Sequence, residues 1–146
     1  MSQNNGLKRL KIVLALFFVS YLFYGVSFLF LPGMLSEMSG DPAKLSWIQW
    51  TGGPLIALGI GAIQAFRKPD RQGAFITIAT VSTLLIGLTL LYAKIIDASA
   101  KNAWFTLTLC FINLSLFVLL VWAKQGVKAE FNYEAQQVKK RLRAVF

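Results

Sequence analysis

The sequence predicts an all-α membrane protein, a polytopic antiparallel bundle of four transmembrane helices. Two observations lead to this fold class. Of the 146 residues, 56% are hydrophobic and only 14% are charged, whereas roughly a quarter of the residues of a soluble domain carry a charge. In addition, four stretches contain no charged residue over about the ~20 residues that a helix needs to cross a bilayer. These stretches are residues 12–31, 45–66, 73–93 and 103–123.

We expect each stretch to be a helix, because a helix satisfies its own backbone hydrogen bonds in lipid. The first stretch follows the basic sequence "GLKRLK", as a secretory signal would. It is longer than the ~7–15 apolar residues of a signal peptide, and "FLPGML" at its end has no small-x-small cleavage site. We therefore expect an uncleaved first span within one transmembrane domain, residues 1–123, followed by a tail, residues 124–146.

The basic residues predict the orientation of the chain. Twelve of the fifteen lysines and arginines fall on the side of the two termini and of the turn between the second and third stretches. The other side receives Lys44, Lys94 and Lys101. Because short cytoplasmic segments are enriched in lysine and arginine, both termini are predicted to lie in the cytoplasm.

The second stretch contains the unusual sequence "TGGPLIALGIGAIQA", with four glycines and a proline. Small residues spaced four apart would form one face on which a neighbouring helix backbone can approach closely. This predicted helix-packing face consists of Gly53, Ala57, Gly61 and Ala65. Gly52 and Pro54 predict a kink near the non-cytoplasmic end. The alternative is a short re-entrant segment that starts at Trp47.

Polar residues inside the stretches form a second candidate site. Asn113 lies near the centre of the fourth stretch, where an amide side chain needs a hydrogen-bond partner. One interpretation is an intramembrane site for a small molecule or a lipid headgroup; the other is hydrogen bonding between helices. The candidate residues are Ser20, Tyr24, Ser27, Gln49, Gln64 and Asn113.

The tail has the pattern of an amphipathic helix, because its apolar residues between Phe131 and Val145 recur at spacings of three and four. Lys139, Lys140 and Arg143 flank this face, and Arg141 lies among them in the sequence. We expect them to bind anionic headgroups, which hold the tail on the cytoplasmic membrane surface. The alternative is a basic tail that frays.

Several chemistries are excluded or not expected. The chain has a single cysteine, Cys110, and no histidine, so it has neither an internal disulfide nor a zinc or haem site that uses histidine. No stretch contains the carboxylate that a proton-coupled transporter commonly uses. Although the net charge is +9, the basic residues cluster between apolar stretches, which favours lipid headgroups over nucleic acid. We expect no enzymatic activity, no catalytic residue, no metal and no cofactor.

Three segments resemble the DoxX-like group of small bacterial membrane proteins. They are "LFYGVSFLFLPGML", "WTGGPLIALGIGAIQAFRKPDRQGA" and "IGLTLLYAKIIDASAKNAW", and the resemblance covers residues 12–123. It implies a four-helix bundle in the bacterial inner membrane, and some members of this group are named as subunits or partners of membrane redox systems. Many relatives carry an acidic residue in the last span where this chain has Asn113.

Three functional hypotheses follow. The first is a non-enzymatic structural or accessory subunit that packs through the small residues of the second stretch, either within the chain or in a homo-oligomer or larger membrane complex. The second is a small transporter or channel whose path follows the polar candidate residues. The third is an enzyme or a redox subunit that binds a quinone or a lipid and relies on Tyr24 or Tyr92.

Overall fold

A computed structural model describes residues 5–40, 45–69, 72–96 and 103–145. This part of the chain contains helices and no strand, which confirms the all-α prediction. The helices are α1 (Asn5–Phe30), α2 (Pro32–Ser39), α3 (Leu45–Arg67), α4 (Gly73–Ile96) and α5 (Ala103–Val145).

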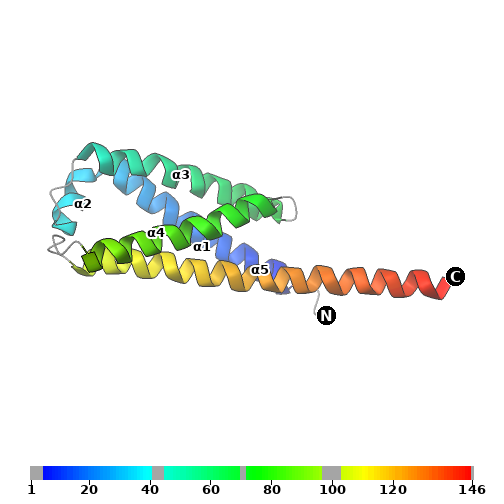
Figure 1. The fold of residues 1–146 in the computed structure, drawn as a ribbon. Helices are drawn as coiled ribbons and strands as arrows, with labels where there is room; N and C mark the ends of the chain where they lie inside the picture. Colours follow the sequence, from blue (N-terminus) through cyan, green and yellow to red (C-terminus); the bar gives the residue numbers. More distant parts are fainter. Residues whose placement is uncertain (1–4, 41–44, 70–71, 97–102, 146) are drawn as a thin grey trace.

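The four long helices alternate in direction and lie along one another (Figure 1). We call the end that carries α2 the α2 end, and the end with the short connection between α3 and α4 the turn end. Helix α1 packs mainly against α3, α4 packs mainly against α5, and α1 also contacts α5. Helices α3 and α4 make few contacts with each other, and their ribbons separate toward the α2 end (Figure 1).

The described residues include three stretches long and apolar enough to cross a membrane. These are Asn5–Phe30, Gly73–Ile95 and Trp104–Val127. In the most apolar 18 residues of each stretch, at most 28% of the residues are buried inside the protein. Side chains such as Phe23 and Phe111 are 66% and 73% exposed. A helix that is apolar on its outer as well as its inner face is typical of a membrane span, so the chain has the character of a membrane protein.

Helix α3 is not among these three stretches. Its mean hydropathy is lowered by two glutamines, a proline and the glycines, namely Gln49, Gln64, Pro54, Gly52, Gly53, Gly59 and Gly61. That α3 spans the membrane stays a prediction. The helix is continuous from Leu45 to Arg67 with Pro54 inside it, rather than divided into a re-entrant segment and a shorter helix. The Pro54 ring is exposed, so it does not interrupt the contact with α1. The kink stays a prediction.

The packing face of α3 differs from the predicted one. Gly53 and Ala57 are exposed, and a Cβ atom added at Gly53 would meet nothing within 4 Å. Gly61 and Ala65 do pack, the former against Phe75 of α4. The close approach to α1 uses Gly52 instead, one residue away and therefore about 100° around the helix. Contact of Gly53 and Ala57 with another chain stays a prediction.

The short helix α2 is an element that the sequence analysis does not predict. Pro32 occupies its first turn, where a proline costs no hydrogen bond. Gly40 ends it in the left-handed conformation with φ of 67°, and its N–H donates to the Glu37 carbonyl oxygen at 3.2 Å. Leu35 is buried, and α2 packs against α1, α3 and α5.

The main core fills the turn half of the molecule and extends to Tyr21 near its middle. Phe17 of α1 is fully buried and stacks on Tyr21, with ring centroids 4.0 Å apart. Alanines from α3, α4 and α5 leave room for the larger side chains of α1 and α5. The buried cluster consists of Leu10, Val13, Leu14, Phe17, Tyr21, Ala62, Ala65, Ile76, Ala79, Leu116, Leu120 and Ala123.

Helix α5 shows no break at the predicted boundary after residue 123. It continues in the same direction to Val145 (Figure 1), so the tail is helical but is not a separate helix. At the start of the tail, the Lys124 ammonium donates to the Thr77 hydroxyl at 2.8 Å. The side chains of Lys139, Lys140, Arg141 and Arg143 lie outside the described residues, and their binding to the membrane surface stays a prediction.

Candidate functional site: an apolar cavity between the long helices

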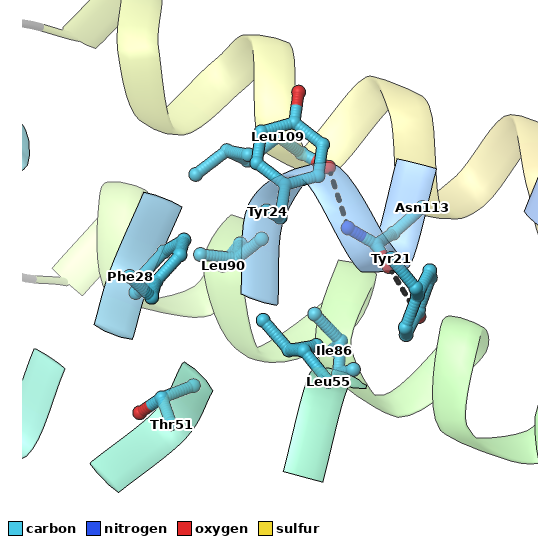
Figure 2. A pocket seen from close by; sticks show the side chains of 9 residues that line it. All are labelled: Tyr21, Tyr24, Phe28, Thr51, Leu55, Ile86, Leu90, Leu109 and Asn113. Atoms are coloured by element: carbon cyan, nitrogen blue, oxygen red, sulfur yellow. Dashed lines mark hydrogen bonds between the residues drawn. The ribbon is translucent and has the colours of Figure 1, made fainter. Parts of the chain in front are cut away.

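A cavity of about 180 Å³ lies between the four long helices (Figure 2). Each of the four helices contributes at least two side chains to its wall. The lining residues are Tyr21, Tyr24, Phe28, Thr51, Leu55, Ile86, Leu90, Leu109 and Asn113. All of them belong to the α2 half of the molecule, where α3 and α4 separate.

The position of the cavity follows from how the helices pack. At the turn end the short connection between Arg67 and Gly73 holds α3 beside α4, and small buried residues such as Ala62 and Ala79 let the helices approach. No comparable connection holds α3 to α4 at the α2 end. The space that opens there is bounded by α1 and α5, which supply most of its aromatic and polar side chains.

One wall of the cavity carries a buried hydrogen-bonded pair. The Tyr21 hydroxyl donates to Asn113 Oδ1 at 2.8 Å, and Asn113 Nδ2 donates to the Leu109 carbonyl oxygen at 2.9 Å. Tyr21 and Asn113 are 3% and 7% exposed. Such a bond between membrane helices contributes about 0.6 kcal/mol on average, and it offsets the cost of placing the amide in an apolar interior.

The amide of Asn113 has more hydrogen-bonding capacity than these two bonds use. An amide nitrogen has two hydrogens and an amide oxygen has two lone pairs. Asn113 Oδ1 accepts one hydrogen bond, from Tyr21, and Asn113 Nδ2 donates one, to Leu109. Both Tyr21 and Asn113 are buried, so the pair presents little polar surface to the cavity. The rest of the wall is almost entirely apolar, apart from Tyr24 and Thr51.

The structure brings only two of the six predicted polar residues to the cavity, Tyr24 and Asn113. The Ser27 hydroxyl donates to the Phe23 carbonyl oxygen of its own helix at 2.8 Å. Gln49 and Gln64 are exposed, because the helix face that meets α1 lies elsewhere on α3. Ser20 is half-buried and does not line the cavity.

Tyr21, the partner of Asn113, is absent from the sequence-based candidates. A signal for it exists in the spacing of Leu10, Leu14, Phe17 and Tyr21, which share one face of α1. A tyrosine on an otherwise apolar, inward face is a natural partner for a buried amide. The predicted set followed Ser20 and Tyr24 instead, on a neighbouring face.

The remaining polar groups near α4 and α5 bond within the protein. Cys110 Sγ donates to the Gly87 carbonyl oxygen at 3.3 Å. The Thr83 hydroxyl donates to the Thr80 carbonyl oxygen at 2.9 Å. Among the side chains that the structure describes, no buried nitrogen or oxygen lacks a partner. These groups therefore serve helix packing, and the candidate site is the cavity itself.

Comparison of the chain with protein-family models, with curated proteins and with solved structures finds no match. The function is therefore inferred from the cavity and from the surfaces of the helices.

Proposed function

We propose that this chain is a non-enzymatic inner-membrane protein with four spans and cytoplasmic termini, and that its cavity binds the apolar part of a lipophilic molecule. Three helices have the length and apolar character of spans. Helix α3, with 23 residues, is about 35 Å long, enough for the ~30 Å hydrocarbon core. The apolar cavity between the long helices is the observation that supports binding of a lipophilic molecule.

The size of the cavity limits the ligand. Apolar cavities of about 150 Å³ in proteins remain dry and bind benzene, and this cavity measures about 180 Å³. It therefore accommodates one ring or a short segment of an acyl chain. Pockets that enclose a whole drug-sized ligand measure about 300–1,000 Å³, so the remainder of a quinone or lipid would extend out of the cavity.

Leu90→Trp tests this proposal, because Leu90 lines the cavity and a tryptophan there would fill it. We expect binding of ubiquinone-1, measured by native mass spectrometry in mild detergent, to fall at least tenfold. The matched control is Leu88→Trp, on the same helix at a 47% exposed position outside the cavity, and it should bind as the parent does. The proposal would be contradicted if the parent bound neither ubiquinone-1 nor a co-extracted lipophile. Equal binding of ubiquinone-1 by Leu90→Trp and Leu88→Trp would also contradict it.

A polar transport path receives less support from the geometry. Such a path needs polar side chains along a continuous route, whereas Gln49 and Gln64 are exposed and Ser27 bonds to its own helix. The cavity walls are apolar at most positions. Binding of a lipophile therefore accounts for the site better than passage of a polar solute.

An accessory subunit is the second candidate function, and it rests on the exposed small residues of α3. Gly53 and Ala57 face outward, with open space at Gly53. We expect Gly53→Leu to shift a homo-oligomer or larger complex toward the monomer, measured by native mass spectrometry after mild extraction. Ala93→Leu, at an exposed position of α4, is the control. An unchanged mass distribution for Gly53→Leu would remove this candidate.

A further inference from the structure

A groove of about 530 Å³ lies between α1 and α3 near the turn end, on the outer surface and away from the cavity. Its floor is apolar, formed by α1 residues between Ile12 and Val19 and by Phe66 of α3. Lys8 and Lys11 line its end nearest the N-terminus. The groove thus combines an apolar channel along the helices with two cations at its head.

A second apolar hollow of about 260 Å³ adjoins the first. The two share Ala15 and Phe66. Ala62 and Ile63 of α3 form part of the wall of the second hollow. Two apolar hollows therefore meet at one alanine and one phenylalanine.

The two lysines are placed to hold one anion. They are three residues apart on α1 and so lie on the same helix face. Lys11 Nζ lies 5.7 Å from the centroid of the Phe66 ring, which keeps its ammonium over the groove. Glu37, the one carboxylate among the described side chains, belongs to α2 at the opposite end.

We propose that this groove binds an anionic phospholipid of the cytoplasmic leaflet. The phosphate lies between Lys8 and Lys11, one acyl chain follows α1 from Ile12 to Val19, and the second occupies the hollow beside Ala15 and Phe66. A lysine binds a phosphate as a point charge, and its aliphatic stem packs on apolar surface. The proposal rests on the proposed orientation of the membrane spans, and it does not depend on what the cavity binds.

The double variant Lys8→Gln/Lys11→Gln tests whether the two lysines bind the phosphate. Native mass spectrometry measures the binding of dioleoyl phosphatidylglycerol and dioleoyl phosphatidylcholine, which are added in equal amounts. We expect the preference of the parent for phosphatidylglycerol to fall about 30-fold, from the attraction of two lysines to an anionic headgroup. The matched control is Arg67→Gln/Lys68→Gln, which removes two exposed cations from the same end outside the groove and should keep the preference.

The apolar part is tested with Ala15→Phe, which places a ring in both hollows and leaves the charge unchanged. Retention of both phospholipids should fall, whereas the control Ala74→Phe, at an exposed position of α4, should retain them. Should Ala15→Phe fail to fold, the lysine variants decide the matter alone. Leu90→Trp should leave phosphatidylglycerol binding intact, which separates this site from the cavity.

Three outcomes would overturn the proposal. An equal loss of preference in Arg67→Gln/Lys68→Gln would show that the charge acts diffusely and not in the groove. Displacement of phosphatidylglycerol by millimolar inorganic phosphate would show an anion site that does not require acyl chains. Equal lipid retention by folded Ala15→Phe and Ala74→Phe would show that the two hollows hold no chain.

Discussion

Gly52→Leu should lower the free energy of unfolding by about 3 kcal/mol or more, the upper range for overpacking a closely packed contact. A Cβ atom at Gly52 would lie 2.7 Å from the Gly25 carbonyl oxygen and 2.9 Å from the Leu29 backbone nitrogen. Backbone atoms cannot rotate away as a flexible side chain can. Helices α1 and α3 would have to separate to admit the new side chain.

Gly53→Leu is the matched control, because it makes the same chemical change one residue along the same helix. Nothing in the chain lies within 4 Å of a Cβ atom at Gly53, so we expect the free energy of unfolding of the monomer to change by no more than about 0.5 kcal/mol. Thermal unfolding of both variants in the same detergent, followed by circular dichroism, makes the comparison. Similar melting temperatures for the two variants would contradict the close approach of α1 to α3.

Phe17→Ala should be the most damaging truncation in the core, at about 3 kcal/mol. Burial from lipid gains less than burial from water, because lipid is as apolar as the interior, which places the value at the low end of the range for buried phenylalanines. The main cost is the loss of van der Waals contacts around the space that the phenylalanine ring leaves empty. Phe17 is fully buried and stacks on Tyr21, so its loss also removes support for the bond to Asn113.

The control for this truncation is Phe23→Ala, on the same helix but 66% exposed. Its ring lies on the outer surface of the helices, so we expect the free energy of unfolding to change by less than about 1 kcal/mol. Chemical unfolding in mixed micelles gives both values. In addition, Phe17→Ala should weaken ubiquinone-1 binding, whereas Phe23→Ala should not. Equal stability of the two variants would contradict the assignment of Phe17 to the core.

The helical regions could be predicted from the sequence because long charge-free stretches are a strong signal, but their ends could not. Helix α1 begins at Asn5, seven residues before the predicted span, since lysine and arginine end an apolar stretch without ending a helix. The same reason lets α5 continue beyond Ala123. Charge marks where a span leaves the hydrocarbon core, and only capping residues mark where a helix stops.

Helix α2 could not be found by the same criterion, because its eight residues are far too short for a span. Pro32 and Gly33 together are typical of a loop, yet a proline is also favourable in the first turn of a helix. Gly40 provides the matching stop signal. Reading Pro32 and Gly40 as the two ends of one element would have predicted α2.

The candidate site was predicted in part. The amide of Asn113 required a buried partner, and the structure provides one in Tyr21. Spacing along one helix defines its faces but not which neighbour each face meets. The sequence therefore predicts Tyr24 and Gly53 as contact residues, where the structure uses Tyr21 and Gly52. Rotation of a helix about its axis is set by packing with residues distant in sequence, and a single sequence contains little information about it.

The pairing of α1 with α3 and of α4 with α5 has a consequence for biosynthesis. Each pair is an antiparallel helical hairpin, and the two hairpins follow one another along the chain. Helices α1 and α3 can thus pack together, with Gly25 against Gly52, before the ribosome has completed α4. The cavity exists only after the second hairpin docks, since Ile86, Leu90, Leu109 and Asn113 complete its wall. A bound lipophile would then touch both hairpins and hold together two units that were made one after the other.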